Sequence, residues 1–184
     1  MNKSFSIGIP CHVSHVALLQ DSVDSYNNQT LKPTEIIISV SESRKRLNLT
    51  SEIPLKIIYS KNRLYAGENR NIIMDNNTSD YVLFSDADDI PHPSRVECII
   101  HTFSNYKNTD FVLHKYSCSP NSAEQFGQIK IDYKEFLLIK NEITSIKVNN
   151  YNKLDLESGY HHGAVSIRKD LYDKVKWTNK IKGQ

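Results

Sequence analysis

Three carboxylates stand within four residues in the segment Ser85-Asp86-Ala87-Asp88-Asp89. They follow directly on Tyr81-Val82-Leu83-Phe84, an apolar run that has the pattern of a buried strand. Carboxylates this close repel one another, and a divalent cation removes that cost. Their hard oxygen atoms suit Mg²⁺ or Mn²⁺. The segment therefore predicts a metal site, and an acidic turn before the next helix is the structural alternative.

A second candidate feature, Gly67-Glu68-Asn69-Arg70-Asn71, opens a predicted helix upstream of the acidic segment. The free N–H groups of a first helical turn favour an anionic ligand, and the Arg70 guanidinium adds a positive charge. A surface position is the ordinary role of a single arginine. Its occurrence together with the acidic segment favours a binding role.

Short apolar runs alternate with helical stretches along the chain. Strands are predicted at 5–9, where Pro10 stops the run, and at 35–40, 55–59, 81–84, 111–114 and 163–167. Helices are predicted from Ser14 as N-cap, at 66–74, from Pro93 or Ser94 to Tyr106, and at 169–175. The segment 133–140 fits either a helix or a strand.

The order of these elements predicts an α/β fold with a mostly parallel central sheet flanked by helices on both faces. In such sheets ligands bind beyond the carboxyl ends of the strands, which is where Asp86 and Asp88 lie. The 184 residues fit a single domain, 1–184, and contain no internal repeat or linker.

Composition argues against two classes of protein. A formal net charge of +2 does not favour nucleic-acid binding. No segment approaches the roughly 18 apolar residues that span a bilayer, so any membrane contact is expected to be peripheral. The stretch from Arg168 onward is basic, and a solvated helix face explains it more simply than an anionic acceptor or a membrane surface.

The cysteines indicate a reducing environment. Cys11, Cys98 and Cys118 are odd in number and far apart, and the short apolar run after Met1 is too brief for a secretory signal. We therefore expect free thiols and a cytoplasmic location.

Several segments occur together in a characteristic order. They are Ile7-Gly8-Ile9-Pro10, Asn28-Gln29-Thr30, Pro33-Thr34-Glu35-Ile36-Ile37-Ile38, Gly67-x-x-Arg70-Asn71, Tyr81 through Asp89 and, more loosely, Gly163 through Lys169. This order resembles that of family 2 glycosyltransferases. The resemblance implies a GT-A fold with a Rossmann-like nucleotide-binding half. It also implies metal-dependent, inverting transfer of a sugar from a nucleotide diphosphate, with a UDP-sugar favoured, to a hydroxyl of a glycan or another acceptor.

The resemblance also assigns roles to residues of the donor site. Pro10, Cys11 and His12 should border the nucleotide base, and Arg70 should lie near the base or the diphosphate. Asp86 should face the ribose or a metal-bound water, and Asp88 should bind the Mn²⁺ or Mg²⁺ that bridges the phosphates. The cation would stabilise the charge that develops on the departing diphosphate.

The chain departs from the family pattern at the base. Cys11-His12-Val13 replaces the usual residues after the first-strand proline, and the His12 ring could still stack on a base. Ser41 or Glu42 stands where the family carries aspartates that read the base.

The third departure from the family pattern concerns the general base of the reaction. Inverting members of the family use a carboxylate, often in a Glu-Asp pair that would be expected soon after Gly183, whereas this sequence ends at Gln184. Either the sequence is C-terminally truncated or another residue serves. Asp155 and Glu157 are the nearest candidates, with ordinary loop carboxylates as the alternative.

Two histidines and two aromatic residues complete the candidates. His161 and His162 are each either a further metal ligand or a structural histidine, because neutral imidazole binds Mn²⁺ well. Tyr160 and Trp177 are either platforms for a sugar ring or core residues.

Two rival functions remain. One is a non-catalytic nucleotide-sugar binding module, or a partial domain of a larger transferase. The other is a nucleotidyltransferase, which is disfavoured because Ile7-Gly8-Ile9-Pro10-Cys11 is not a glycine- and lysine-rich phosphate loop.

Overall fold

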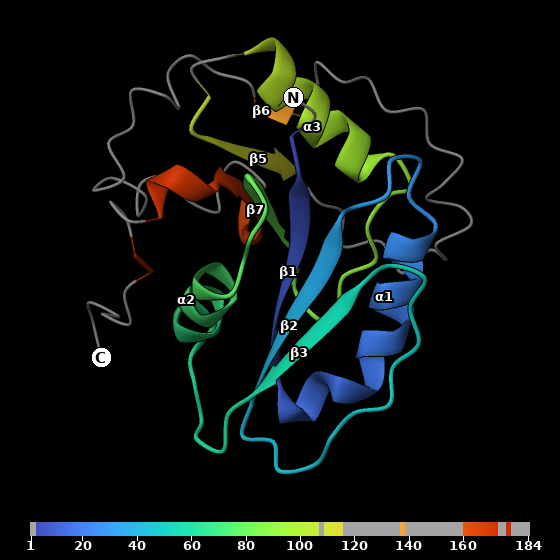
Figure 1. Cartoon of the computed structure of the whole chain (residues 1–184), viewed down its shortest axis with the longest axis vertical. Helices are drawn as coiled ribbons and strands as arrows, with labels where there is room; N and C mark the ends of the chain where they lie inside the picture. The colour runs from blue at the N-terminus through green and yellow to red at the C-terminus, as the bar shows by residue number, and fades with distance from the viewer. Residues whose placement is uncertain (1–2, 107–108, 116–136, 139–159, 173–175, 178–184) are drawn as a thin grey trace.

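The computed structural model describes residues 3–106, 109–115, 137–138, 160–172 and 176–177, and its centre is a seven-stranded sheet (Figure 1). The strands are β1 (Phe5–His12), β2 (Glu35–Ser41), β3 (Leu55–Tyr59), β4 (Tyr81–Phe84), β5 (Phe111–Lys115), β6 (Leu137–Leu138) and β7 (Tyr160–Arg168). The α-helices are α1 (Leu19–Asn27), α2 (Ala66–Asp75) and α3 (Arg95–Asn105). Two 3₁₀ helices lie at Val13–Leu18 and Lys169–Leu171.

The sheet has the order β3-β2-β1-β4-β7-β5-β6. Strands β3, β2, β1 and β4 pair in parallel. Strand β7 then pairs antiparallel with β4 on one side and with β5 on the other, and β6 pairs antiparallel with β5. The predicted α/β class is therefore confirmed, with the parallel half formed by the N-terminal part of the chain.

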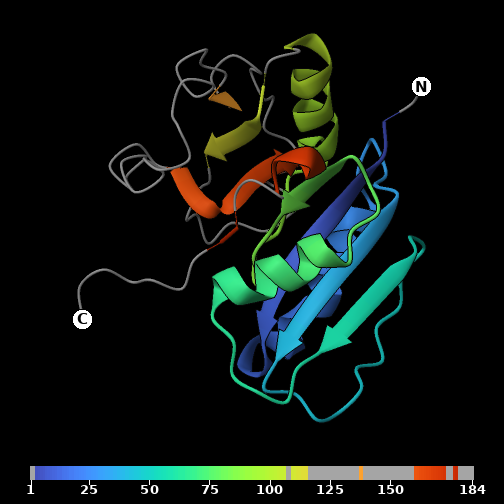
Figure 2. The ribbon, with the colours of Figure 1, turned by 60° about the vertical axis from the view of Figure 1, so that its left-hand side comes forward.

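Helices cover both faces of the parallel half, as predicted. On one face, Ile7 and Ile9 of β1 share an apolar core with residues of α1 and α3. On the other face, Ile37 and Phe84 pack with residues of α2. Figure 2 shows α2 in front of the strands and α1 behind them. Alternation along each strand assigns neighbouring side chains to opposite cores, and each fully buried aliphatic side chain contributes about 1.5–3 kcal/mol.

Gly8 allows α2 to approach β1 closely. A Cβ atom at this position would lie 2.9 Å from the side chain of Ile73 and 3.0 Å from the ring of Phe84. Any larger residue would push α2 away from the sheet, which gives the glycine of the Ile7-Gly8-Ile9-Pro10 segment a packing role.

The prediction that Pro10 ends the first strand is wrong, because β1 continues to His12 and pairs with β2 up to Ser41. Strand β4 pairs only with Phe5–Gly8 of β1. Gly8 faces β4 with its backbone, because its carbonyl accepts a hydrogen bond from the Ser85 N–H (3.0 Å). Residues two apart in a strand face the same side, so the Pro10 nitrogen also points toward the β4 side, at a level beyond the end of β4. The missing N–H of proline therefore costs no ladder hydrogen bond.

The predicted helix start at Ser14 is also wrong. A 3₁₀ helix, Val13–Leu18, comes first, and α1 begins at Leu19. His12 caps the 3₁₀ helix, because its ring Nδ1 accepts the Ser14 N–H at 3.2 Å. The bounds of α2 and α3 agree with prediction to within about two residues, the usual uncertainty of helix ends.

Two late predictions are resolved in part. The segment 133–140 contains strand β6, and the helix predicted at 169–175 is a 3₁₀ turn at Lys169–Leu171, with 173–175 outside the described residues. No helix in the described ranges has the length and apolar character needed to cross a bilayer.

Candidate active site

The carboxyl ends of β1, β2 and β4 bring most of the predicted donor-site residues to one edge of the sheet. His12, the last residue of β1, is in register with Ser41, the last residue of β2. Strand β4 ends at Phe84, and the Ser85 N–H bonds to Gly8 of β1. The acidic segment therefore leaves the sheet beside β1, at the edge where ligands bind in open α/β sheets.

Arg70 forms an ion pair with Asp86. Its Nη2 lies 3.1 Å from Asp86 Oδ1, and the side chains are 2% and 27% exposed. The guanidinium carbon also lies 5.0 Å from the ring centroid of Trp177 and 5.8 Å from that of Phe84. Trp177 is held in turn by Asn71, which exchanges two hydrogen bonds with its backbone. Arg70 is thus a buried cation paired with Asp86, and this bond restrains the orientation of the Asp86 carboxylate.

The three carboxylates differ in their surroundings. Asp86 and Asp89 close a turn, in which the Asp89 N–H donates to Asp86 O at 3.2 Å and the Asp86 N–H to Asp89 Oδ2 at 3.4 Å. Although Asp89 has an exposed surface, its carboxyl group is turned back onto the protein. Partial burial and the negative charge of Asp86 raise its pKa. The Asp88 side chain is 52% exposed, with its Oδ2 3.8 Å from His15 Nδ1, so Asp88 is the carboxylate presented to solvent.

The acidic segment fits one kind of metal binding. Among the described residues no three His, Cys, Asp or Glu side chains are grouped so that they could hold a metal ion by themselves. Mg²⁺ is commonly bound by one or two carboxylates that share it with phosphate oxygens and water. Asp86 and Asp88 fit that mode. The side chains of His161 and His162, on β7, lie outside the described residues, as do Asp155, Glu157 and the side chain of Tyr160.

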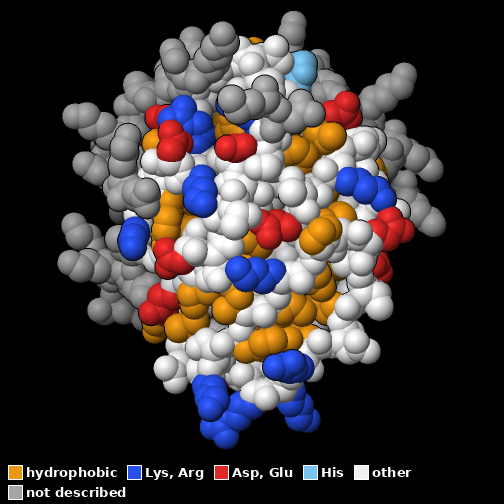
Figure 3. All heavy atoms as spheres, viewed as in Figure 1, with side chains coloured by type: hydrophobic (Ala, Val, Ile, Leu, Met, Phe, Trp, Pro, Cys, Tyr) orange, Lys and Arg blue, Asp and Glu red, His pale blue; other side chains and the backbone are white. Residues whose placement is uncertain are grey.

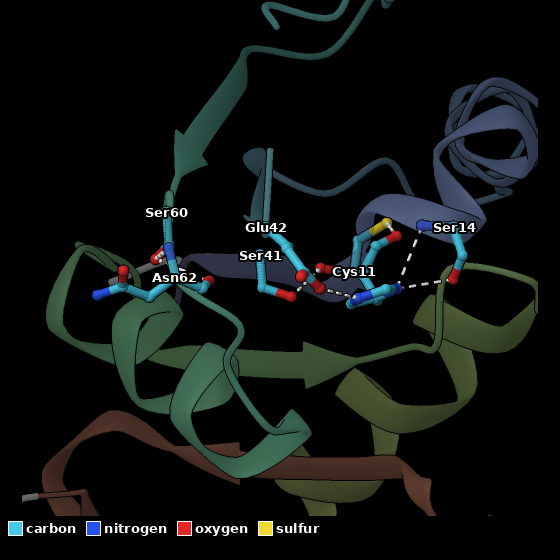
Figure 4. Close-up of polar contacts among 7 residues, drawn as sticks. Cys11, Ser14, Ser41, Glu42, Ser60 and Asn62 are labelled. Carbon is cyan, nitrogen blue, oxygen red and sulfur yellow. Dashed lines mark hydrogen bonds and ion pairs between the residues drawn. The ribbon is translucent and has the colours of Figure 1, made fainter. Parts of the chain in front are cut away.

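His12 and Glu42 form the second part of the site, and Figure 4 shows Glu42 together with Cys11, Ser14 and Ser41. His12 Nε2 lies 2.7 Å from Glu42 Oε2, and the side chains are 36% and 48% exposed. The other ring nitrogen, Nδ1, accepts the backbone N–H of Ser14. Nδ1 is therefore the acceptor, Nε2 carries the proton, and the ring donates to the Glu42 carboxylate.

Glu42 has an unusual backbone conformation. Its φ is 61°, in the left-handed region that side chains with a Cβ atom rarely adopt. The Glu42 N–H donates to Asn62 O and the Ser43 N–H to Ser60 O, both at 3.0 Å, so the segment after β3 holds the turn in place. Such strained conformations concentrate at functional sites. Here the turn brings the carboxylate to His12.

Cys11, Ser41 and Pro10 lie beneath the exposed pair. All three are buried, and the Ser41 hydroxyl donates to the Cys11 carbonyl at 3.4 Å. Burial, and secondarily the negative charge of Asp88, raises the pKa of the Cys11 thiol to about 12. These residues support the position of His12 in this structure, and their direct contact with a nucleotide stays a prediction.

Arg95 is a site residue that the sequence analysis did not identify. It is 3% exposed, and its guanidinium donates to His114 Nε2 (2.7 Å), the Tyr26 hydroxyl (2.8 Å) and the Phe84 carbonyl (2.6 Å). It thereby ties α3 to β5, α1 and the end of β4, from which the acidic segment begins. A cation on the buried face of α3, in line with Ile99 and Thr102, was the available signal.

The side chain of Gln29, in the Asn28-Gln29-Thr30 segment, joins two helices. Its side chain donates to His92 O (2.8 Å) and accepts the Val96 N–H (3.0 Å), so it joins the end of α1 to the start of α3. Gln29 therefore serves the N-terminus of α3, where Ser94, the N-cap residue, makes no capping bond with its side chain.

Comparisons with known proteins agree with this architecture. The model of the family described as Glycosyl transferase family 2 matches residues 6–176. An uncharacterized glycosyltransferase from Haemophilus influenzae is 26% identical over 98 residues, which cover 52% of this chain and 33% of that protein. The chain thus spans about a third of the length of this relative.

Two solved structures share the fold. The crystal structure of S. aureus TarS 1-349 has a TM-score of 0.62 at 14% identity, over 98% of this chain and 52% of that chain. Glucosyl-3-phosphoglycerate synthase from Mycobacterium tuberculosis, in complex with Mn²⁺, UDP-glucose and phosphoglyceric acid, has a TM-score of 0.55 at 15% identity, over 92% and 58% of the two chains. At these identities the similarity shows the fold alone.

Proposed function

Because this chain belongs to glycosyl transferase family 2, we propose that it transfers a sugar from a nucleotide diphosphate to a hydroxyl of a glycan or another acceptor, with inversion at the anomeric carbon and with Mn²⁺ or Mg²⁺ bound. One observation carries the proposal. The exposed Asp88 carboxylate, the Arg70–Asp86 pair and the His12–Glu42 pair lie at the carboxyl ends of neighbouring parallel strands. That edge is where an α/β sheet binds a nucleotide.

The His12–Glu42 pair is proposed to bind the nucleotide base. The Glu42 carboxylate has acceptor capacity beyond its bond to His12, and uracil offers an N–H donor. The His12 ring, whose orientation is set by Ser14 and Glu42, offers a flat face for stacking. Cys11 and Ser41 hold the backbone beneath this pair. A UDP-sugar is the favoured donor, and the complex of the M. tuberculosis synthase with UDP-glucose supports this choice.

The Asp86–Asp88 segment is proposed to hold the metal together with the diphosphate. The ion pair with Arg70 fixes Asp86, and Asp88 is exposed toward a ligand. When bound, the cation supplies positive charge that stabilises the departing diphosphate. The Mn²⁺ in the complex of the M. tuberculosis synthase supports a divalent metal here, and His161 or His162 is a proposed additional ligand.

The reaction itself needs a carboxylate beside the acceptor. In the proposed step the carboxylate takes the proton of the acceptor hydroxyl, whose oxygen attacks the anomeric carbon from the face opposite the diphosphate. The bond from that carbon to the phosphate oxygen breaks, and its electron pair leaves with the diphosphate. Asp155 or Glu157 is proposed as this base. We also propose that residues 1–184 form a single catalytic domain and that it lies in the cytoplasm.

A non-catalytic nucleotide-sugar binding module is the second candidate. The chain spans 52% and 58% of the lengths of the two solved structures described above. Such a module would bind the donor and leave it intact.

A thermal-shift screen against UDP, GDP, dTDP and CMP, each with and without Mn²⁺, tests the donor site, because a ligand of the native state raises its stability. We expect a shift that requires both Mn²⁺ and one nucleoside diphosphate. Release of that diphosphate from the corresponding nucleotide-sugar then distinguishes the transferase from the binding module. The absence of a shift from a well-folded sample would contradict both.

A further inference from the structure

Five cationic residues gather on two loops at one end of the molecule. Arg44, Lys45 and Arg46 follow β2, Lys61 and Arg63 follow β3, and all five are exposed. We call these five residues the cationic end. Figure 3 shows Lys and Arg side chains together at the lower end of the molecule, with no Asp or Glu side chain among them.

The fold holds the two loops together. The Glu42 N–H donates to Asn62 O, and the Ser43 N–H donates to Ser60 O, so the segments after β2 and β3 run side by side. The Ser43 hydroxyl also donates to the Lys45 carbonyl at 3.1 Å, which fixes the start of the first loop. The five charges are therefore concentrated on one surface although they come from separate parts of the sequence.

The charges of the cationic end are not neutralised by ion pairs with the residues that the structure describes. No residue of the cationic end forms an ion pair with another residue that the structure describes. The nearest acid in sequence, Glu42, is bonded to His12 instead. Like charges held together without counter-charges repel one another, so an anionic partner would relieve this cost.

The rest of the chain has the opposite sign. The sequence contains 23 Lys and Arg residues and 21 Asp and Glu residues, so removing these five cations leaves 18 against 21, a net charge of −3. A flat anionic surface would therefore attract one end of the molecule and orient it.

An aromatic side chain accompanies the charges. Tyr65 directly precedes α2, two residues after Arg63, and is 60% exposed. Tyrosine is enriched at the interface between lipid and water, where its ring and hydroxyl are both accommodated. Exposed Lys and Arg beside such a ring match the anionic headgroup region of a bilayer.

We propose that the cationic end binds the anionic headgroups of a phospholipid bilayer. The surface adjoins Glu42, so a chain bound in this way has the His12–Glu42 edge close to the headgroups. A sugar acceptor embedded in or attached to the membrane would then lie near the candidate site. The binding itself requires no nucleotide, and its test is independent of the proposed transferase activity.

Cosedimentation of the full chain with vesicles tests the proposal. The vesicles contain phosphatidylcholine alone or phosphatidylcholine with phosphatidylglycerol, and each is assayed at low and at high salt. The variant pair is Lys61→Gln with Arg63→Gln, and the matched control is Lys32→Gln with Lys56→Gln, which removes two exposed cations elsewhere. Thermal unfolding of each variant confirms that it is folded.

We expect binding only to the phosphatidylglycerol vesicles, weakened by salt, and weakened about tenfold or more by the first pair of substitutions. The control pair should stay within about twofold of the unaltered chain. If the two pairs of substitutions weakened vesicle binding equally, the proposal would be overturned, because net charge alone would then explain binding. Equal binding to both kinds of vesicle would overturn it as well. The proposal would also be overturned if a single-stranded oligonucleotide bound through the cationic end and anionic vesicles did not displace it.

Discussion

The guanidinium of Arg70, on α2, lies 3.1 Å from the carboxylate of Asp86, in the segment that follows β4. Only 2% of the Arg70 side chain is exposed, and the ring of Trp177 lies 5.0 Å from its guanidinium carbon. The arginine is therefore enclosed between an aromatic ring and a carboxylate. Its charge stabilises the orientation of Asp86, which is proposed to hold the metal together with the diphosphate of the nucleotide-sugar.

Replacing this cation should affect both stability and binding. We expect Arg70→Met to lower the free energy of unfolding by about 2–4 kcal/mol, because the partly buried Asp86 carboxylate loses its partner. Urea denaturation measures this change, and the Mn²⁺-dependent shift with nucleoside diphosphate should also shrink. Lys32→Met removes an exposed ion pair with Glu52 and should leave stability unaltered. Equal effects of the two substitutions would refute the role assigned to burial.

Asp88 should be needed for metal response and dispensable for folding. Its side chain is 52% exposed, so we expect Asp88→Asn to unfold at the temperature of the unaltered chain in the absence of ligand. The additional stabilisation that Mn²⁺ provides with the nucleoside diphosphate should be lost. Asp170→Asn, which removes another exposed carboxylate, is the control and should retain that response. A full Mn²⁺ response in Asp88→Asn would remove this residue from the metal site.

Glu42 should show opposite effects on stability and on binding. Glycine tolerates a φ of 61°, so we expect Glu42→Gly to be as stable as the unaltered chain or more stable by about 1 kcal/mol. The same change removes the carboxylate beside His12, so affinity for the nucleoside diphosphate should fall. Glu42→Val should be clearly destabilised, because a β-branched residue is poorly tolerated in this region. Denaturation curves and titration calorimetry report the two quantities separately.

Arg95 should be the most sensitive of these positions to substitution. Arg95→Met removes three buried hydrogen bonds, to His114, Tyr26 and the Phe84 carbonyl, and we expect the free energy of unfolding to fall by about 3–5 kcal/mol. Arg95→Lys should also be strongly destabilised, since an ammonium cannot reproduce the guanidinium fork. Arg168→Met, at a more exposed arginine, provides the comparison. A mild effect of Arg95→Met would contradict the importance of these three bonds.

The Cys11 thiol should make the stability of the folded chain depend on pH in the alkaline range. Burial raises the pKa of its thiol from the ordinary 9.0 to about 12, so the folded chain keeps a proton that the unfolded chain releases. Stability that is fully present below pH 9 should therefore decline between pH 9 and 12. Cys11→Val lacks this group and should show a weaker decline over the same interval. The difference between the two denaturation series is the measured quantity, and parallel series would exclude the thiol as a cause.

The structure agrees best with the sequence pattern in elements that depend on neighbouring residues alone. Strands β3 and β4 have the predicted bounds, because each is a short, mostly apolar run that a polar serine follows. The local preferences of proline and serine do not predict the structure at Pro10 and Ser14. The early end of β4 makes Pro10 harmless, and the ring of His12 takes over the cap beside Ser14.

The candidate site was predicted as a set of residues without their partnerships. Asp86 and Asp88 were identified because they follow a strand directly, and position in sequence was sufficient. The bond of His12 to Glu42 joins residues 30 positions apart, and it depends on the register of β1 against β2. Arg95 was missed because its acceptors lie on three separate elements.

The amino-acid sequence by itself determined the α/β class, the alternation of strands and helices, and the acidic segment at the end of β4, since each follows from the periodicity of neighbouring residues. Only the tertiary structure decided that β7 enters antiparallel between β4 and β5, that Arg70 faces Asp86, and that two loops form one cationic end. These relationships join distant segments. Sheet register and helix packing, which local pattern leaves undetermined, bring those segments together.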